Sequence, residues 1–343
     1  MFRSKVLHGS ALTLLAATLL ACDRTPEARP RPPSPPPAAT TTTSTAPASV
    51  SASGQAKPEN FRLPSSARLV AIGDIHGDLK ALRAALRLAG AINGEDDWVG
   101  KDLTVVQTGD QVDRGDQDRE VLDVLEKLEG AAKAAGSALH VLNGNHELMN
   151  AAGDFRYVTP AGFTSFADFA TKVDRAELAR FSPLERGRAA AFSPGGPYAL
   201  KLAERSTILM LGDTVFVHGG VTSEHVHYGV KRINNDVSRF MRGEIRQLPP
   251  ILQSDDSPLW LRAYSQEPLS RGACTRLEQT LAELGARRMV VGHTVQPSGI
   301  NSACSERVWR IDVGMARHYG GPRQVLEIQD KSVRVIAGTG PRD

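Results

Sequence analysis

The chain has 343 residues, 41% of them hydrophobic, and this amount of apolar side chain is enough for one large domain or two small ones. Its formal net charge of +3 is concentrated at the N-terminus, because residues 1–66 carry a net charge of +4. The remaining 277 residues hold 34 basic and 35 acidic side chains. A body so close to neutrality lacks the basic surface that nucleic acids require, so we exclude a nucleic-acid-binding protein.

The first 22 residues have the pattern of a secretory signal peptide. Arg3 and Lys5 precede the apolar run 11–20, which is too short to span a bilayer, because a transmembrane helix needs about 20 apolar residues. The end of this run, 19–22, resembles a bacterial lipobox, in which the cysteine is lipidated and becomes the new N-terminus. We therefore expect an exported protein in the periplasm or cell envelope, held on a membrane through a lipid at Cys22. The alternative is ordinary cleavage, which would release a soluble periplasmic protein.

Residues 23–66 are rich in Pro, Ala, Thr and Ser, and Phe61 is their only aromatic residue. A segment of this composition cannot bury enough apolar area to offset its ordering entropy, so we expect a disordered tether. Pro-rich chain extends by ~3.1 Å per residue, which gives the tether a reach on the order of 100 Å. The globular domain is then expected at 67–343.

Three units of strand, polar turn and helix are expected at the start of this domain. Successive units of this kind indicate a sheet with parallel strands, whose carboxyl ends line a ligand crevice. All the polar turns fall on that edge, so their side chains are expected to converge there. The units are strand 68–72, turn GDIHG (73–77) and helix 78–91; strand 103–106, turn GDQVDRG (109–115) and a helix through 121–128; and strand 139–142 with turn GNHE (144–147).

The second half of the domain does not repeat this succession of strand, turn and helix. Residues 151–205 are mixed in character, with several aromatic, Gly and Pro residues, and are expected to form a mainly helical cap over the site. Two apolar runs around 212–213 predict a β-hairpin that ends at His218, and a short strand at 289–291 ends at His293. The later strands look antiparallel, so the complete sheet system is expected to be mixed. Further expected elements are helices at 224–245 and 275–284 and a C-terminal hairpin of 325–328 and 333–336.

Five strand ends therefore carry potential metal ligands. They supply two carboxylates, three imidazoles and one amide oxygen, which are too many donors for one ion and suit two divalent ions such as Mn, Fe or Zn. Such ions, ~3.5 to 4 Å apart, lower the pKa of a bridging water and promote in-line attack at phosphorus. Asp110 comes from the central motif and is the natural bridge between them. Each side chain alone could be an ordinary core residue, so the indication comes from their coincidence. The donors are Asp74, His76, Asp110, Asn145, His218 and His293, and His146 stands beside Asn145.

The turns GDIHG, GDQVDRG and GNHE, followed by HGG and GHT, resemble the signature of the calcineurin-like metallophosphoesterase superfamily, and within it of the phosphoprotein phosphatases. The resemblance runs from about Arg68 to the C-terminus. It implies an α/β fold, a four-layer α/β/β/α sandwich of two mixed sheets with a dinuclear metal site between them, to which the cap is added. It also implies that Asp74, His76, Asp110 and His293 hold one ion, while Asp110, Asn145 and His218 hold the other.

The same resemblance implies roles in catalysis. His146 would be the general acid that protonates the leaving oxygen, with Asp113 orienting it. Arg114 would hold the phosphoryl oxygens with its planar fork, a feature that favours monoesters over diesters. A second clamp is expected without being fixed by a motif. Arg262 is the first choice for it and Arg156 the second.

Departures from the eukaryotic Ser/Thr phosphatases define the subgroup. Gln111 replaces the usual Tyr, and Asn143 stands where Arg usually precedes GNHE. Together with residues 143–150, 153–160 and SPLW at 257–260, they make the chain most similar to the Shewanella-like bacterial phosphatases, some of which favour phosphotyrosine. We therefore expect a metal-dependent phosphomonoesterase, a protein phosphatase that acts on phosphorylated proteins or small phosphoesters through a bridging hydroxide. The alternatives are a hydrolase of dinucleoside polyphosphates or other phosphoanhydrides, and a catalytically silent lipoprotein that binds phosphorylated ligands.

Lipidation of Cys22 would leave two cysteines, Cys274 and Cys304. Disulfides persist in exported proteins, so we hypothesise that these two pair. In the chain-entropy model, a loop of that size stabilises the fold by ~3 to 4 kcal/mol.

Overall fold

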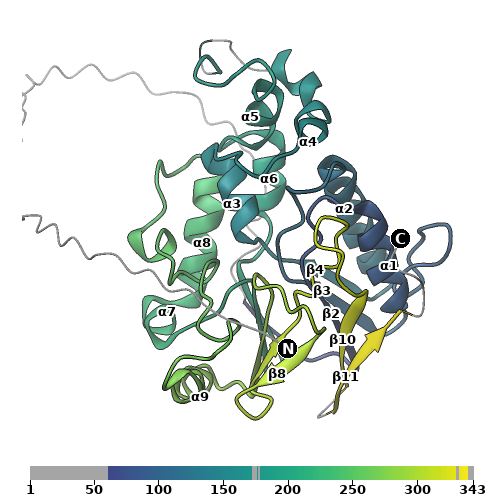
Figure 1. Cartoon of the computed structure of the whole chain (residues 1–343), viewed down its shortest axis with the longest axis vertical. Helices are drawn as coiled ribbons and strands as arrows, with labels where there is room; N and C mark the ends of the chain where they lie inside the picture. Colours follow the sequence, from purple (N-terminus) through teal and green to yellow (C-terminus); the bar gives the residue numbers. More distant parts are fainter. Residues whose placement is uncertain (1–60, 172–175, 177, 330–331, 339–343) are drawn as a thin grey trace, which may run out of the picture. The chain divides into compact units, whose positions relative to one another are not determined.

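The computed structural model describes residues 61–171, 176, 178–329 and 332–338 (Figure 1). The predicted signal peptide, Cys22 and nearly all of the predicted tether lie outside these residues. Within the described part of the chain, none of the helices has the length and apolar character needed to cross a membrane.

The first of two sheets holds the three predicted strand–turn–helix units. Its strand order is β11-β10-β2-β3-β4, and β2, β3 and β4 run parallel, as the units predict. The predicted C-terminal hairpin adds β10 antiparallel to β2 and β11 antiparallel to β10, so the sheet is mixed. Its strands are β2 (Arg68–Ile72), β3 (Leu103–Gln107), β4 (Ala138–Val141), β10 (Gln324–Gln329) and β11 (Ser332–Ala337).

The second sheet has six strands in the order β1-β5-β6-β7-β9-β8. β5 and β6 form the predicted hairpin, whereas β6, β7 and β9 run parallel, so this sheet is also mixed. The parallel pairing of β6 with β7 brings His218 and His293, which follow these strands, to one edge. Its strands are β1 (Arg62–Leu63), β5 (Ile208–Leu211), β6 (Thr214–Val217), β7 (Arg288–Val291), β8 (Asn301–Ala303) and β9 (Val308–Arg310).

The two sheets pack face to face between two layers of helices, which confirms the predicted four-layer sandwich (Figure 1). Alternate residues of both sheets form the core between them, among them Val106 and Leu326 of the first sheet and Phe216 and Val290 of the second. The outer helices are α1 (Leu79–Leu88) and α2 (Asp118–Ala134) on the first sheet, and α7 (Ser223–Tyr228), α8 (Val230–Met241) and α9 (Ala273–Leu284) on the second.

The segment predicted as a cap, 151–205, is mainly helical in its described residues. An aromatic cluster that includes Phe155, Phe166, Phe192 and Tyr198 holds its helices together. Its elements are the end of α3 (Asn145–Ala152), α4 (Pro160–Thr164), the 3-10 helix η1 (Ala167–Thr171), α5 (Arg186–Phe192) and α6 (Pro197–Ala203). A further 3-10 helix, η2 (Pro250–Leu252), lies between α8 and α9.

The folded domain begins earlier than the sequence indicates. Residues 61–66 were expected in the tether, but Arg62 and Leu63 form β1 and pair in parallel with β5. The amides of Met210 and Gly212 donate to the carbonyls of Phe61 and Leu63 at 2.7 and 3.0 Å. The predicted boundary between tether and domain is therefore too late in the chain. Residues 61–63 join the domain because β5 offers backbone groups for pairing and the segment carries two apolar side chains, Phe61 and Leu63.

The helix expected at 224–245 is instead two helices, α7 and α8. Gly229 separates them with φ of 106°, a left-handed conformation that glycine adopts without steric cost.

The pairing of Cys274 with Cys304 is confirmed, and this disulfide ties the start of α9 to the turn after β8 across a Cα–Cα distance of 5.1 Å.

Candidate metal centre and active site

Asp110 lies at the middle of the converging turns, directly after β3. Its Oδ2 is 3.7 Å from Nε2 of His76 and 3.7 Å from Nε2 of His146, and its Oδ1 is 3.3 Å from Nε2 of His218. Burial opposes ionisation, but the imidazoles of His218 and His146 outweigh it and lower the pKa of Asp110 well below its usual value. A permanent carboxylate whose two oxygens face different imidazoles is suited to bridge two ions.

Asp74 and His76 lie on one side of Asp110, together with His146. Oδ2 of Asp74 is 3.9 Å from Nε2 of His76, and the backbone amide of His293 donates to the same carboxylate. The Nδ1–H of His76 donates to the carbonyl of Val112 at 3.2 Å, which leaves Nε2 free as a ligand. Nε2 of His293 is buried and has no hydrogen-bond partner among the described residues.

His218, Asn145 and the imidazole of His293 lie on the other side, where ligand atoms of Asp110, His218 and His293 lie within 4.8 Å of one another. Oδ1 of Asn145 is 2.8 Å from Nε2 of His218, and Nδ1 of the same imidazole donates to the carbonyl of Thr108 at 3.1 Å. Burial lowers the pKa of His76 to about 4 and that of His293 to about 2, so both imidazoles stay neutral, as ligands must be. Nitrogen and carboxylate donors with fixed tautomers and an orphaned imidazole fit divalent cations.

The predicted general acid is paired with its predicted partner. Nδ1 of His146 donates to Oδ2 of Asp113 at 2.6 Å, and Nε2 is left facing the centre. Although burial opposes protonation, the carboxylates of Asp110 and Asp113 raise the pKa of His146 to about 9. The imidazole therefore carries a proton at neutral pH.

Arg188 in α5 was missed by sequence reasoning. Its guanidinium is fully buried, donates to Oδ1 of Asp113 at 2.8 Å, and forms an ion pair of 2.6 Å with Asp118. Asn150 also donates to Oδ1 of Asp113, at 2.9 Å. Asn150 stands one helical turn after His146, so its spacing could have revealed it. No local pattern marks Arg188, because it reaches Asp113 from 75 residues away.

Glu147, the last residue of GNHE, fixes two of the turns to each other. Its carboxylate accepts from the backbone amides of Asp110, Gln111 and Gly144 at 2.9, 2.9 and 2.7 Å. Asp312, which follows β9, is a further buried carboxylate that sequence reasoning missed, and it contributes to raising the pKa of Asp74, after burial itself. The first glycine of GDIHG permits this approach, because a Cβ on Gly73 would lie 2.4 Å from the carbonyl oxygen of Ile311.

Arg114 stands beside this centre, held by two aromatic rings. Its guanidinium carbon is 4.1 Å from the ring centroid of Tyr157 and 5.7 Å from that of Tyr319. The rings of these tyrosines lie 5.1 Å from His146 and 5.4 Å from His76, respectively. Nε of Arg114 is buried without a partner among the described residues, so its guanidinium group has a hydrogen-bond donor that is not used. Stacking fixes the cation without consuming its hydrogen bonds.

The two candidates for a second clamp differ in position. Arg262 is exposed, and its charge contributes to lowering the pKa of His293, after burial and His218, so it stands near the centre. Arg156 is paired with Asp154 at 2.7 Å on the surface. Of the two, the structure brings Arg262 toward the ligands.

The part of the chain that carries this site is similar to known proteins. The family model described as calcineurin-like phosphoesterase matches residues 67–297. Shewanella-like protein phosphatase 2 of Arabidopsis thaliana is 39% identical over 311 residues, which cover 80% of this chain and 78% of the relative. Shewanella-like protein phosphatase 1 of Plasmodium berghei is 30% identical over 286 residues, covering 79% and 74%. The solved structure of a cold-active protein tyrosine phosphatase is 25% identical, with a TM-score of 0.64 and coverage of 80% and 78%.

Proposed function

The chain belongs to the calcineurin-like phosphoesterase family and is a metal-dependent protein phosphatase, and we propose how its side chains divide the work of hydrolysis. The observation that carries the proposal is the position of Asp110, whose carboxylate faces three imidazoles, one of which is held by Asp113 at 2.6 Å. Ligands and an acid that converge on one carboxylate favour an active phosphatase over a catalytically silent binding protein.

Two divalent ions are proposed at this centre. Asp74, His76 and Asp110 would hold one, and Asp110, Asn145 and His218 the other. The resemblance assigns His293 to the first ion, but its imidazole lies beside His218, so we propose that it completes the second site. When bound, such ions supply the positive charge that polarises the phosphoryl group and acidifies the attacking water. The mixed oxygen and nitrogen donors suit Mn, Fe or Zn.

The side chains around the centre would bind the substrate and deliver the proton. Arg114, fixed by Tyr157, would donate two parallel hydrogen bonds to the phosphoryl oxygens. His146 would donate its Nε2 proton to the leaving oxygen, while Asp113 holds Nδ1 and keeps the ring in place. Arg262 would approach the phosphoryl group from the side of His293.

A large groove beside Arg114 and His76 supports a protein substrate. It has a volume of about 1290 Å³ and runs past the turn after β2 toward the turn between β9 and β10. Its charged lining is mainly basic, so we propose that acidic residues next to the phosphorylated residue occupy it. The basic side chains are Lys80, Arg87, Arg114, Arg317 and Arg323, and the acidic ones are Asp78 and Asp116.

The decisive test compares the wild-type protein with His146→Asn after reconstitution with Mn, Fe or Zn. We expect the variant to bind metal as the wild type does and to lose turnover of a phosphopeptide by ~10² to 10⁴, the range of a general acid. Unaltered turnover would remove His146 from this role. Wild-type protein that cleaves diadenosine tetraphosphate but no phosphopeptide would replace the proposed substrate with a phosphoanhydride.

We further propose that the enzyme is exported and anchored to a membrane of the cell envelope through Cys22. The support is the signal-peptide pattern of residues 1–22 and the tether that follows. Mass spectrometry of the mature N-terminus should find a lipidated cysteine. An N-terminus without lipid would leave only export.

A further inference from the structure

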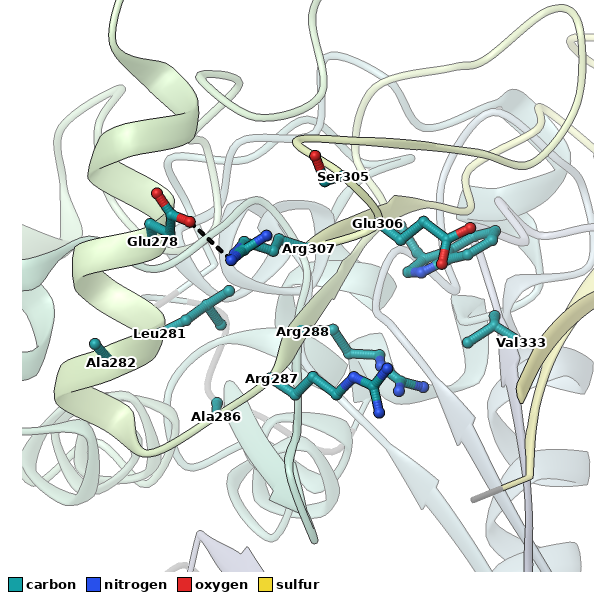
Figure 2. Close-up of a pocket in the computed structure, with 11 residues that line it drawn as sticks. Glu278, Leu281, Ala282, Ala286, Arg287, Arg288, Ser305, Glu306, Arg307 and Val333 are labelled. Atoms are coloured by element: carbon teal, nitrogen blue, oxygen red, sulfur yellow. Dashed lines mark ion pairs between the residues drawn. The ribbon is translucent and has the colours of Figure 1, made fainter. Parts of the chain in front are cut away.

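A second cavity lies at the opposite end of β7 from the metal centre. It has a volume of about 430 Å³ and is bounded by α9, by the turn between β8 and β9, and by β11 (Figure 2). Arg288 opens β7 and lines this cavity, whereas His293 stands two residues beyond the end of the strand. A strand rises ~3.3 Å per residue, so the two positions are roughly 15 Å apart and the cavity is separate from the active site.

Arg288 is buried at this cavity without a hydrogen-bond acceptor for part of its guanidinium. Only 2% of the residue is exposed, and its Nη1 is buried with no partner among the described residues. The carboxylates of Asp213 and Glu306 are near enough to attract the charge, yet within the described part of the chain neither forms an ion pair with it. A buried N–H without an acceptor destabilises a fold, so such a group indicates a missing partner.

Trp309, which also lines the cavity, carries a second unused donor. It is 8% exposed, and its indole Nε1 is buried with no partner among the described residues. Val290 pairs with Trp309 across β7 and β9, which places Arg288 and Trp309 on the same face of the sheet.

The distribution of unused nitrogens supports a ligand site. Among the described residues, four buried side-chain nitrogens have no hydrogen-bond partner. Two of them, on Arg114 and His293, face the centre where a phosphoryl group and metal ions are proposed. The other two belong to Arg288 and Trp309, which line this second cavity.

The residues that line the cavity carry more basic than acidic side chains. Arg287 and Arg288, both drawn in Figure 2, line the cavity. Arg307 is neutralised by an ion pair of 2.8 Å with Glu278, also drawn there. Within the lining, Glu306 is then the remaining carboxylate beside two arginines, and Asp213, outside the lining, is also near enough to attract Arg288.

We propose that this cavity binds a phosphate-type oxyanion, either inorganic phosphate or the phosphate group of a small organic ester, between Arg288 and the indole of Trp309. Guanidinium forks match the oxygens of phosphate, and an indole N–H adds one further donor. The disulfide between Cys274 and Cys304 joins the two walls of the cavity, so the site is preformed.

The test follows the indole N–H signals of the metal-loaded protein by NMR, after ¹⁵N labelling of its three tryptophans. Inorganic phosphate, methylphosphonate, sulfate and acetate are titrated at constant ionic strength. We expect phosphate to shift the Trp309 signal saturably and to leave Trp98 unchanged. Trp260, whose ring lies 5.6 Å from His293, reports separately on phosphate at the metal centre. Saturation with methylphosphonate would identify an ester-type phosphate as ligand, and a response to phosphate alone would identify the free ion.

Arg288→Met should weaken the Trp309 response at least tenfold and leave basal phosphatase activity unchanged. Phosphate should raise the melting temperature of the wild type more than that of this variant. Arg276→Met, on the exposed side of α9 and outside the lining, serves as the matched control. If Arg288→Met does not fold, Arg288→Lys keeps the charge without the fork and should weaken the response in the same direction. A wild-type Trp309 signal that ignores phosphate, or one that responds equally to acetate, would overturn the proposal.

Discussion

Arg188 in the helical cap donates to Asp113 in the second catalytic turn at 2.8 Å, although 75 residues separate them. Its guanidinium also pairs with Asp118 at 2.6 Å and packs on the rings of Phe166 and Phe192. Asp113 in turn holds His146. The cap is therefore connected to the proposed general acid through one buried cation.

The first prediction is that Arg188 positions the acid. Arg188→Met would leave two carboxylates buried without their cation, a change that costs ~3 to 5 kcal/mol and threatens the fold. Arg188→Lys keeps the charge but cannot hold both carboxylates in a fixed fork. We expect this variant to retain its metal and to lose roughly tenfold in kcat on a phosphoserine peptide, with little change in KM.

Substrates with different leaving groups distinguish a positioning role of Arg188 from general damage to the fold. The leaving group p-nitrophenolate departs readily without being protonated, so Arg188→Lys should hydrolyse p-nitrophenyl phosphate nearly as fast as the wild type. Arg186→Lys in the same helix is the matched control, because Arg186 bonds the carbonyl of Phe181 instead of Asp113. An equal loss on both substrates would show a purely structural role for Arg188.

The second prediction concerns the bridging role of Asp110. Its two oxygens face His76 and His146 on one side and His218 on the other. Asp110→Asn removes the charge shared by both proposed ions, so metal analysis should find both sites depleted. Asn145→Ala removes a ligand of one ion and should deplete that one alone. Full occupancy of one site in Asp110→Asn would contradict the bridge.

The third prediction is a contribution of His225 to acid sensitivity. Burial lowers its pKa to about 4, and its Nδ1 accepts from the amide of Thr222 at the start of α7. The unfolded chain has a histidine pKa of about 6.5, so the unfolded state binds more protons between these values. The stability from neutral His225 is therefore fully present above pH ~6.5 and is lost as the pH falls toward 4. The loss is on the order of 2 to 3 kcal/mol.

Urea denaturation at a series of pH values measures this contribution. His225→Gln keeps an acceptor in the helix cap but does not titrate, so its free energy of unfolding should fall less between pH 6.5 and 4. His227→Gln, in the same helix but exposed, should follow the wild type. Parallel curves for wild type and His225→Gln would remove His225 as a source of the pH dependence.

The sequence predicts the metal ligands better than the residues around them, because the ligands directly follow strands that can be recognised from local sequence. Asp74, Asp110 and Asn145 follow buried parallel strands, so one periodic pattern places all of them on one edge. Arg188 and Asp312 reach the site through the tertiary fold, and nothing in their neighbourhoods marks them. β8 and β9 have three residues each and lack a readable alternation, so their order in the sheet depends on packing. Gly229 divides a helix whose apolar spacing continues through it.

The last prediction assigns the basic groove to substrate selection. Arg317 and Arg323 line it outside the proposed machinery, and Arg317 is exposed. The paired change of both to Glu reverses the local field and should lower kcat/KM for an acidic phosphopeptide by roughly tenfold at low salt, with the loss shrinking as salt screens the charges. p-Nitrophenyl phosphate has no flanking residues that could contact Arg317 or Arg323, so its hydrolysis should be unchanged. Arg246→Glu, exposed and outside the lining, controls for net charge. If the paired variant keeps the wild-type preference among acidic, neutral and basic phosphopeptides, the groove does not select substrates by the residues that flank the phosphorylated residue.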